Sequence, residues 1–237
     1  MSLERPKKYE WFFPALNPAL SWLFNMADAQ NVLLNLAAFH PNAHVLGPGN
    51  RAAIWVQGCP FNCKGCIAPD WIPDKPANLV DPLILADTIL KLPHLDGITI
   101  SGGEPMTQAE ALFRLVDRIR YINDLSVIIF SGYRYENLVD APPGPFVHKL
   151  LENIDVLIDG LYIERLNNGK GLRGSTNQRF IHLTDRLKDY DFENIPRKVE
   201  VHLSDGEAFL VGVPDSKVLD AFQRGLDKAR SRQIYGG

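Results

Sequence analysis

The chain has 237 residues, of which 46% are hydrophobic and 22% charged, and its formal net charge at pH 7 is -3. This composition is typical of a soluble globular protein with enough residues for one well-buried domain. The small negative charge provides no general basic surface, so nucleic acid is not an expected partner. No run approaches the roughly 18 apolar residues that a membrane-spanning helix needs.

Residues 1–30 form a segment of unusual composition. An aromatic-rich run, Trp11–Phe24, follows a charged stretch and superficially resembles the apolar region of a signal peptide. Pro14 and Pro18 interrupt that run. We therefore predict an N-terminal arm that packs its aromatic side chains on the body of the fold, with an arm that docks a partner as the alternative. Residues 31–237 are predicted to form a single domain.

Short apolar runs alternate with helical patterns through the rest of the chain. Such alternation is typical of βα units that build a parallel sheet. Two of the apolar runs are nearly continuous, as expected where both faces of a sheet are covered. The predicted strands are Val32–Phe39, Ala53–Gln57, Gly97–Ile100, Ser126–Phe130 and Asp155–Ile158.

Helices are predicted between these strands. Asp81 and Pro82 supply an N-cap and a first-turn proline for a helix over Leu83–Leu92. Thr107 and Glu110 have the spacing of a capping box, so a second helix is expected to begin there.

The last part of the chain predicts a hairpin and a helix. Ser204-Asp-Gly206 lies between two apolar runs, Val199–Leu203 and Ala208–Val213, and indicates a β-hairpin. After it, Val218, Leu219, Phe222 and Leu226 mark one face of a final amphipathic helix.

The three cysteines of the chain, Cys59, Cys63 and Cys66, lie within eight residues, directly after a predicted strand. Thiolate is the favoured ligand of iron–sulfur iron, and nearby glycines let the backbone wrap closely around a bulky inorganic core. Three cysteines can hold three corners of a [4Fe–4S] cluster and leave the fourth iron open to a small molecule. The pattern therefore favours a reactive cluster over a ferredoxin-like carrier, which needs four thiolates.

Three cysteines could also belong to a disulfide framework or a structural zinc site. A disulfide framework would leave one cysteine unpaired. A structural zinc site closes a tetrahedron with four ligands, so the fourth would have to come from a distant histidine such as His40, His44 or His94. Zinc remains an alternative at this point.

A second motif follows the predicted strand Gly97–Ile100. Gly102 and Gly103 allow a ligand to approach the backbone closely, and Glu104 together with the glycine carbonyls can accept hydrogen bonds from an ammonium group. Taken singly, Gly-Gly-Glu-Pro also fits an ordinary strand-to-helix turn.

Together the two motifs resemble the radical S-adenosylmethionine (SAM) superfamily, in which Cys-x3-Cys-x2-Cys precedes a Gly-Gly-Glu-Pro motif. The resemblance implies that Cys59, Cys63 and Cys66 ligate one [4Fe–4S] cluster and that SAM chelates its fourth iron. It also implies that Gly102, Gly103 and Glu104 hold the methionine amino group. The implied fold is α/β, a partial (β/α) barrel of the radical SAM type, here with a C-terminal β-hairpin and helix.

Four further segments look like those of the activating proteins of anaerobic ribonucleotide reductase, a branch that Gly65 also fits. The segments are Leu46–Arg51, Phe130–Tyr133, Asp155–Gly160 and Leu172–Arg179.

Three residues in these segments are expected to bind SAM: Ser131 in the adenosine pocket, Asp159 at the carboxyl end of a strand, and Arg173 in a glycine-rich loop suited to an anionic group. Tyr133 lines the same pocket or belongs to the core, whereas Asp155 is suited to capping a strand.

The implied reaction begins with one-electron reduction of the cluster by a donor such as flavodoxin. Cleavage of SAM then yields a 5′-deoxyadenosyl radical, which takes a hydrogen atom from a glycine Cα of a partner glycyl radical enzyme. Because the cluster is oxygen-sensitive, we expect the protein in the cytoplasm. No nucleic-acid or membrane partner is expected. The alternatives are a radical SAM enzyme that modifies a peptide, another protein or a small molecule, and a non-catalytic iron–sulfur regulatory module. Neither the substrate nor the oligomeric state follows from the sequence.

Overall fold

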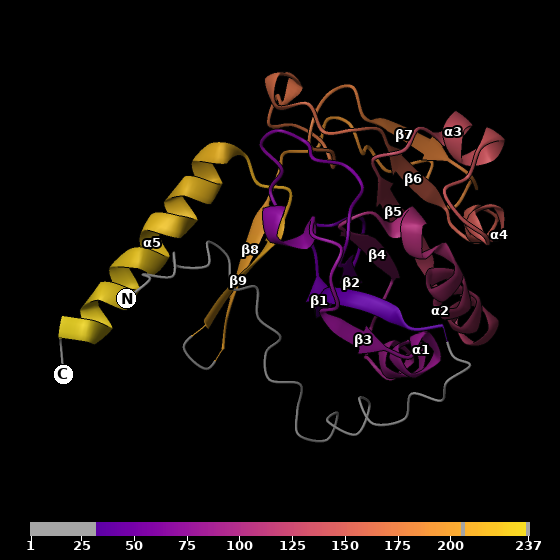
Figure 1. Ribbon diagram of the computed structural model, residues 1–237, viewed down its shortest axis with the longest axis horizontal. Helices are drawn as coiled ribbons and strands as arrows, with labels where there is room; N and C mark the ends of the chain where they lie inside the picture. The colour runs from indigo at the N-terminus through magenta and orange to yellow at the C-terminus, as the bar shows by residue number, and fades with distance from the viewer. Residues whose placement is uncertain (1–31, 205–206, 236–237) are drawn as a thin grey trace.

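Figure 1 shows the computed structural model of the chain, which describes residues 32–204 and 207–235. A seven-stranded mixed sheet forms its centre, with the strand order β3-β1-β2-β4-β5-β6-β7, so the chain has a mixed α/β fold. The predicted N-terminal arm, residues 1–30, lies outside the described residues. The strands are β1 (Leu34–Ala43), β2 (Arg51–Val56), β3 (Asn78–Val80), β4 (Gly97–Gly102), β5 (Ser126–Ser131), β6 (Val156–Asp159) and β7 (Arg179–His182).

The five predicted strands are confirmed with small shifts at their ends, but the prediction of a parallel sheet is wrong at both edges. Strands β2, β4, β5 and β6 are parallel neighbours, whereas β1 runs antiparallel to β2 and β3, and β7 runs antiparallel to β6. Residues 44–50 alone join β1 to β2. A parallel connection needs a crossover of a dozen or more residues, so this short link requires an antiparallel return.

The first predicted helix is confirmed as α1 (Pro82–Leu90). The Asp81 carboxylate accepts hydrogen bonds from the backbone N of Leu83 at 2.8 Å and of Ile84 at 3.3 Å. Two of the otherwise unpaired amides at the start of the helix are satisfied in this way, and Pro82 occupies a position that needs no donor.

The predicted capping box at the start of the second helix is wrong. Helix α2 (Ala109–Ile122) has Gln108 as its N-cap and no side-chain cap hydrogen bond. A 3-10 turn, η3 (Pro105–Gln108), comes first, and in it the Thr107 hydroxyl donates to the Glu104 carbonyl at 2.7 Å. Because proline starts this tighter turn two residues earlier, Thr107 is used before α2 begins.

Both faces of the sheet are buried, which explains the continuous apolar runs in its central strands. One set of alternating residues, including Ile54, Ile100 and Ile129, packs against α1, α2 and α4 (Val147–Leu151). The other set, including Trp55 and Ile158, packs under the cysteine segment, the chain after β7 and the hairpin. A short helix, α3 (Tyr135–Asp140), lies with α4 between β5 and β6.

The predicted hairpin and final helix are confirmed. Strands β8 (Val199–Ser204) and β9 (Glu207–Gly212) form their own two-stranded sheet, and α5 (Ser216–Tyr235) projects from the body of the molecule (Figure 1). The hairpin packs on β1 through His40, whose ring centroid lies 4.0 Å from that of His202 and 5.9 Å from that of Phe209. No helix in the described part of the chain is long and apolar enough to cross a membrane.

Arg51, from the segment Leu46–Arg51, ties the starts of the parallel strands together. Its guanidinium is fully buried and donates to the Thr99 hydroxyl at 2.7 Å, to the Ile98 carbonyl at 2.6 Å and to the Ser126 hydroxyl at 2.9 Å. Burial lowers the pKa of Arg51 to about 10. These contacts lie at the amino ends of β2, β4 and β5, opposite the cysteines, so Arg51 supports the sheet rather than the site.

Candidate functional site

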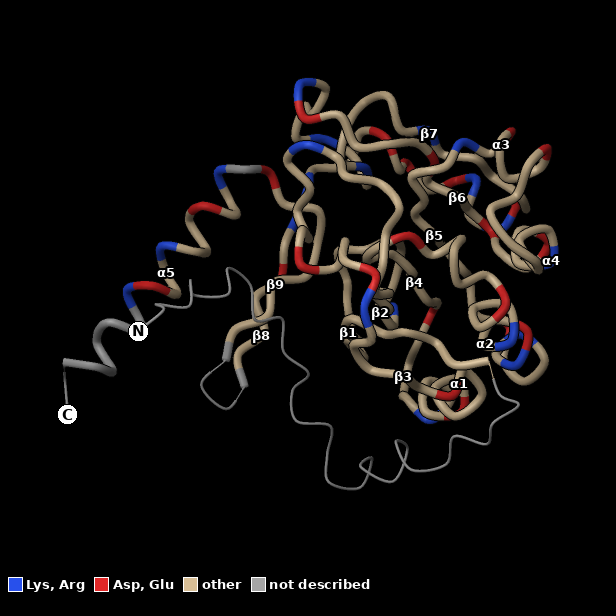
Figure 2. The backbone as a smooth tube through the Cα atoms, in the orientation of Figure 1, with Lys and Arg blue, Asp and Glu red and all other residues tan. Residues whose placement is uncertain are grey.

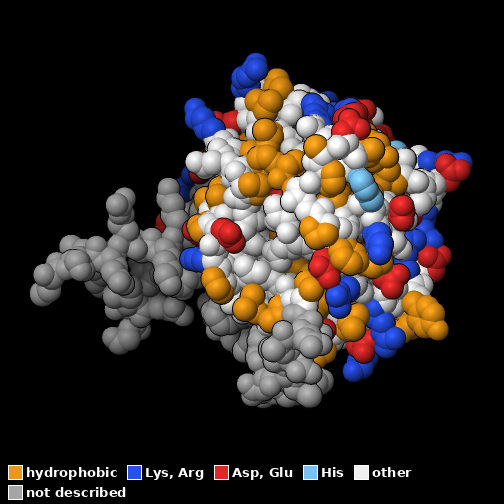
Figure 3. Space-filling model, turned by 45° about the vertical axis from the view of Figure 1, so that its right-hand side comes forward, with side chains coloured by type: hydrophobic (Ala, Val, Ile, Leu, Met, Phe, Trp, Pro, Cys, Tyr) orange, Lys and Arg blue, Asp and Glu red, His pale blue; other side chains and the backbone are white. Residues whose placement is uncertain are grey.

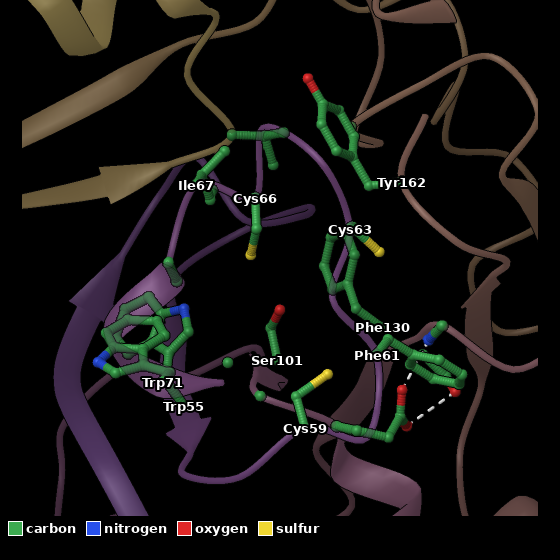
Figure 4. Close-up of a pocket in the computed structure, with 18 of the residues that line it drawn as sticks. Trp55, Cys59, Phe61, Cys63, Cys66, Ile67, Trp71, Ser101, Phe130 and Tyr162 are labelled. Carbon is green, nitrogen blue, oxygen red and sulfur yellow. Dashed lines mark hydrogen bonds between the residues drawn. The ribbon is translucent and has the colours of Figure 1, made fainter. Parts of the chain in front are cut away.

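A cavity of about 180 Å³ lies at the carboxyl ends of β2, β4, β5 and β6. This is the end of a parallel sheet at which α/β folds build their sites. The three cysteines, Ser101, the Gly-Gly-Glu segment Gly102–Glu104 and Ser131 are among the residues that line it. Figure 4 shows the thiols of Cys59 and Cys66 facing the open centre, with Trp55 and Trp71 on one side and Phe61 and Tyr162 on the other. The structure thus brings together the two motifs that the sequence singled out.

The cysteine segment is anchored by backbone hydrogen bonds. Gly58 N donates to the Trp71 carbonyl at 2.9 Å and Cys59 N to the Ile72 carbonyl at 3.0 Å, next to the 3-10 turn η2 (Pro69–Trp71). Gly58 and Gly65 have φ of +97° and +75°, values that favour glycine. The thiols are therefore presented by a loop that is pinned to the fold rather than free.

All three cysteines are free thiols of intermediate exposure. Burial raises the pKa of Cys59 to about 11 and also raises the pKa of Cys66. Thiols in this state stay protonated at neutral pH, and a bound metal is what ionises such ligands.

The donor set fits an iron–sulfur cluster better than a single metal ion. With Zn–S bonds of about 2.3 Å, three thiolates on one zinc would crowd around a single point. Among the described residues, no group of three or more His, Cys, Asp or Glu side chains is arranged in that way. The described lining of the cavity also contains no histidine that could be a fourth zinc ligand. A cluster takes each thiolate on a different iron, which suits three separate thiols on one cavity wall.

The two glycines of the second motif are required by their contact with the cysteine loop. A Cβ atom on Gly102 would lie 2.4 Å from Val56 N, and one on Gly103 would lie 2.1 Å from the Gly58 carbonyl oxygen. The backbones are joined there by hydrogen bonds from Gly103 N to the Val56 carbonyl at 2.7 Å and from Glu104 N to the Gly58 carbonyl at 2.8 Å. Any side chain at these positions would separate the two motifs.

Glu104 connects the end of β4 to the end of β5. The side chain is 1% exposed. One of its oxygens accepts from Met106 N and from the Ser131 hydroxyl, both at 2.9 Å, and the other accepts from Gly132 N at 2.7 Å. Burial raises the pKa of Glu104 to about 7 despite these three hydrogen bonds.

Asp159 is not among the residues that line the cavity. Its buried carboxylate accepts from Tyr135 N at 2.8 Å and from the Arg179 Nε at 2.9 Å. The next residue, Gly160, does line the cavity. Asp159 therefore fixes the end of β6 from the side that faces away from the cavity.

Arg173 lies behind the wall in the same way. Its guanidinium donates to the Gln178 carbonyl at 3.0 Å and to the Glu193 carboxylate at 2.6 Å. The loop that it supports contributes Gly174 and Gln178 to the cavity lining. The structure thus gives both predicted cofactor-binding side chains partners within the protein.

Two other residues from the predicted segments have structural surroundings. Tyr133 packs against the core, with its ring centroid 4.8 Å from that of Phe61 in the cysteine loop. Asp155, at the far end of β6, is fully buried and accepts from Arg120 at 2.7 Å and from the Thr184 hydroxyl at 2.6 Å. Asp155 therefore stabilises the start of β6 and does not face the cavity.

Gln178 is a lining residue that sequence reasoning did not single out. Its side-chain oxygen accepts from Gly174 N at 2.7 Å and from Ser175 N at 3.1 Å, while its amide nitrogen donates to the Gly160 carbonyl at 2.8 Å. One side chain therefore joins the loop after β6 to the loop before β7. The signal in the sequence was its place in the family-like segment Leu172–Arg179, which does not indicate a role for its side chain.

The site combines three thiols with a Gly-Gly-Glu segment at the carboxyl ends of parallel strands. These features define a cluster-binding α/β protein. Comparison with known proteins agrees: residues 45–181 match the family model described as "4Fe-4S single cluster domain". The chain belongs to this family, together with the anaerobic ribonucleoside-triphosphate reductase-activating proteins.

Named relatives support this membership. The activating protein of Vibrio cholerae is 34% identical over 156 residues, which cover 61% of this chain and 96% of the relative. That of Enterobacteria phage T4 is 27% identical over 163 residues, 67% of this chain and 100% of the relative. A putative glycyl-radical enzyme activating enzyme of Haemophilus influenzae is 34% identical over 98 residues, 40% of this chain and 37% of the relative. About a third of this chain or more has no counterpart in the first two.

Proposed function

We propose that the chain is a radical SAM enzyme that activates a glycyl radical enzyme of the anaerobic ribonucleotide reductase type. The observation that carries this proposal is the direct backbone contact between the cysteine loop and the Gly-Gly-Glu segment, through Gly58, Gly103 and Glu104. That contact places three thiols and a buried carboxylate on the wall of one cavity. A cluster and a chelating amino acid need this combination of soft and hard donors.

In this proposal Cys59, Cys63 and Cys66 hold one [4Fe–4S] cluster, and the cavity beside them holds SAM. With both groups bound, the site would supply one-electron reductive cleavage of SAM, giving methionine and a 5′-deoxyadenosyl group able to remove a hydrogen atom from a glycine Cα of the partner. The protein contributes orientation and exclusion of water. The aromatic walls formed by Trp55, Trp71 and Phe61 suit the second task.

The methionine end of SAM is assigned to Gly102, Gly103 and Glu104, which line the cavity together with Ser131 of the adenosine pocket. Glu104 suits an ammonium group, because a neighbouring cation stabilises the ionised form of a carboxyl whose pKa burial has raised to about 7. Ser131 orients that carboxylate through its 2.9 Å hydrogen bond.

Asp159 and Arg173 are proposed to act on SAM indirectly. They fix the backbone on either side of the cavity, at Gly160 and at Gly174–Gln178, through the hydrogen bonds described above. A rigid wall matters because a ligand displaced by about 1 Å reacts some 100-fold more slowly.

We further propose that the seven-stranded sheet is a partial barrel of the radical SAM type, open on one side to a macromolecular substrate. Basic and acidic side chains are intermixed around apolar groups on the face in Figure 3, which favours a protein partner over nucleic acid. The electron donor is expected to be a small redox protein such as flavodoxin. We expect the reaction in the cytoplasm, because the cluster is oxygen-sensitive.

The test is anaerobic reconstitution with iron and sulfide, reduction with dithionite and addition of SAM. The expected products are methionine and 5′-deoxyadenosine, and Cys63→Ser should lose both the cluster absorbance and this activity. Addition of the anaerobic ribonucleoside-triphosphate reductase from the same genome should then give a glycyl radical doublet in its EPR spectrum. A full cluster that leaves SAM intact would refute the enzymatic proposal. Turnover without a glycyl radical would refute the choice of partner.

A further inference from the structure

A second cavity, of about 340 Å³, adjoins the first. Ile67, Tyr162, Asn167 and Pro214 line both cavities, so they share a wall. The second cavity also reaches Gly65 in the cysteine loop. Whatever occupies it therefore lies beside the reacting centre.

This second cavity is built from two different parts of the chain. Tyr162, Glu164 and Asn168 come from the segment after β6, within the part that matches the family model. Asp215 and Lys217 come from the start of α5, beyond residue 181, where that match ends. Figure 1 shows α5 starting above the hairpin and running away from the sheet. Half of the cavity thus belongs to an addition that sets this chain apart from the family model.

Three of the polar side chains that line this cavity have donors without an acceptor within the described residues. The Tyr162 hydroxyl accepts from Asn167 Nδ2 at 3.2 Å, and Asn168 Oδ1 accepts from Lys170 N at 3.1 Å. Within the described residues, no acceptor pairs with the Tyr162 hydroxyl hydrogen, the Asn168 amide nitrogen or the exposed Lys217 ammonium. These three donors suit a ligand rich in carbonyl oxygens.

A peptide fits these features better than a phosphate-bearing ligand. The Glu164 carboxylate, which is 53% exposed and 3.8 Å from Lys64, and Asp215 would both repel a phosphate. Ile67, Pro214 and Leu219 add an apolar flank that a peptide side chain can cover. Charges of both signs also alternate along the described part of α5 (Figure 2), so the helix presents no basic surface for a polyanion.

We propose that the second cavity binds the peptide segment of the protein substrate that immediately flanks the reacting glycine. This inference rests on the proposed function. It makes Asn168 and Lys217 specificity-determining residues for the partner, with no part in SAM cleavage. Because the α5 half lies outside the family match, the cavity adapts this chain to its own partner.

Two variants test the proposal in the reconstituted full-length protein. Asn168→Asp keeps the oxygen that accepts from Lys170 N but removes the amide donor, and Lys217→Glu reverses the charge at the start of α5. Arg224→Glu is the matched control, because it makes the same charge change on an exposed residue of α5 that does not line the cavity. The readouts are 5′-deoxyadenosine formed from SAM without partner, and the glycyl radical formed on the reductase.

The expected result is unchanged 5′-deoxyadenosine formation in all three variants. Glycyl radical formation at limiting partner concentration should fall at least tenfold in Asn168→Asp and Lys217→Glu but not in Arg224→Glu. A photo-crosslinking residue at position 217 should give an adduct within a few residues of the glycine, identified by mass spectrometry.

Wild-type radical yields in both cavity variants would overturn the inference, as would an equal loss in Arg224→Glu or a crosslink far from the glycine. Inhibition of radical formation by a nucleotide competing for position 217 would also overturn it, in favour of a phosphate ligand. A wild-type protein that cleaves SAM but never produces the glycyl radical would instead refute the proposed function itself.

Discussion

Replacing Gly103 with alanine tests the contact on which the site depends. The added Cβ would lie 2.1 Å from the Gly58 carbonyl oxygen and 2.7 Å from its carbon. The cysteine loop and the Gly-Gly-Glu segment must then move apart by about 1 Å to reach an ordinary packing distance, which is the overpacking that costs about 1–3 kcal/mol. The hydrogen bonds at 2.7 Å and 2.8 Å that join the two segments would also be weakened.

We expect Gly103→Ala to lower the free energy of unfolding by about 2–4 kcal/mol, since weakening the two hydrogen bonds adds about 1 kcal/mol in all to the packing cost. For a chain of this size that corresponds to a fall in Tm of roughly 4–16 °C, at about 2–4 °C per kcal/mol. In protein that retains its cluster, SAM cleavage should fall about 100-fold, because cluster and substrate are displaced by about 1 Å.

Thermal unfolding of the cluster-free protein and 5′-deoxyadenosine formation by the reconstituted protein measure these two effects. Gly144→Ala is the control, because nothing lies within 4 Å of the Cβ that it adds. Equal melting temperatures for the two variants, together with normal SAM cleavage by Gly103→Ala, would refute this account of the glycine pair.

Three further outcomes are expected. Gln178→Ala should raise the KM for SAM at least tenfold, because the loops at Gly160 and Gly174 lose their shared hydrogen bonds of 2.7–2.8 Å. Gln178→Glu should recover part of that loss. KM values identical to that of the wild-type protein would contradict the proposal that Gln178 holds the two loops together. Burial, with help from His202, lowers the pKa of His40 to about 4. As the pH falls, His40 therefore binds a proton in the unfolded chain before it does so in the folded one. The free energy of unfolding, measured with urea, should be at its full value above about pH 6.5 and lower by up to about 2 kcal/mol at pH 5. In His40→Gln this decline should shrink, and an unchanged pH profile would exclude His40 as its source. Chelation of iron from the reconstituted protein should abolish the cluster absorbance and SAM cleavage together, whereas cleavage that survives without the cluster would contradict its role.

Local signals in the sequence predicted much of the fold and the heart of the site. The N-cap at Asp81, the paired hairpin strands Val199–Ser204 and Glu207–Gly212, and the apolar runs of the central strands depend on neighbouring residues, and they were correct. The two site motifs were also readable, because each is a short run that the chain keeps together at the end of a strand. Their meeting in one cavity then followed from two adjacent parallel strands, β2 and β4.

What the sequence could not decide were contacts between distant residues. One such contact joins the Asp159 carboxylate to Arg179, which lies 20 residues away in the sequence. Gln178 reaches the Gly160 carbonyl only because β7 runs antiparallel beside β6. The connection between these two strands has no periodic pattern that would have predicted this arrangement. Strand direction at the sheet edges and the choice of partner for each buried charge are set by the whole packed structure, since the free energy of such a pair depends on everything that excludes water around it.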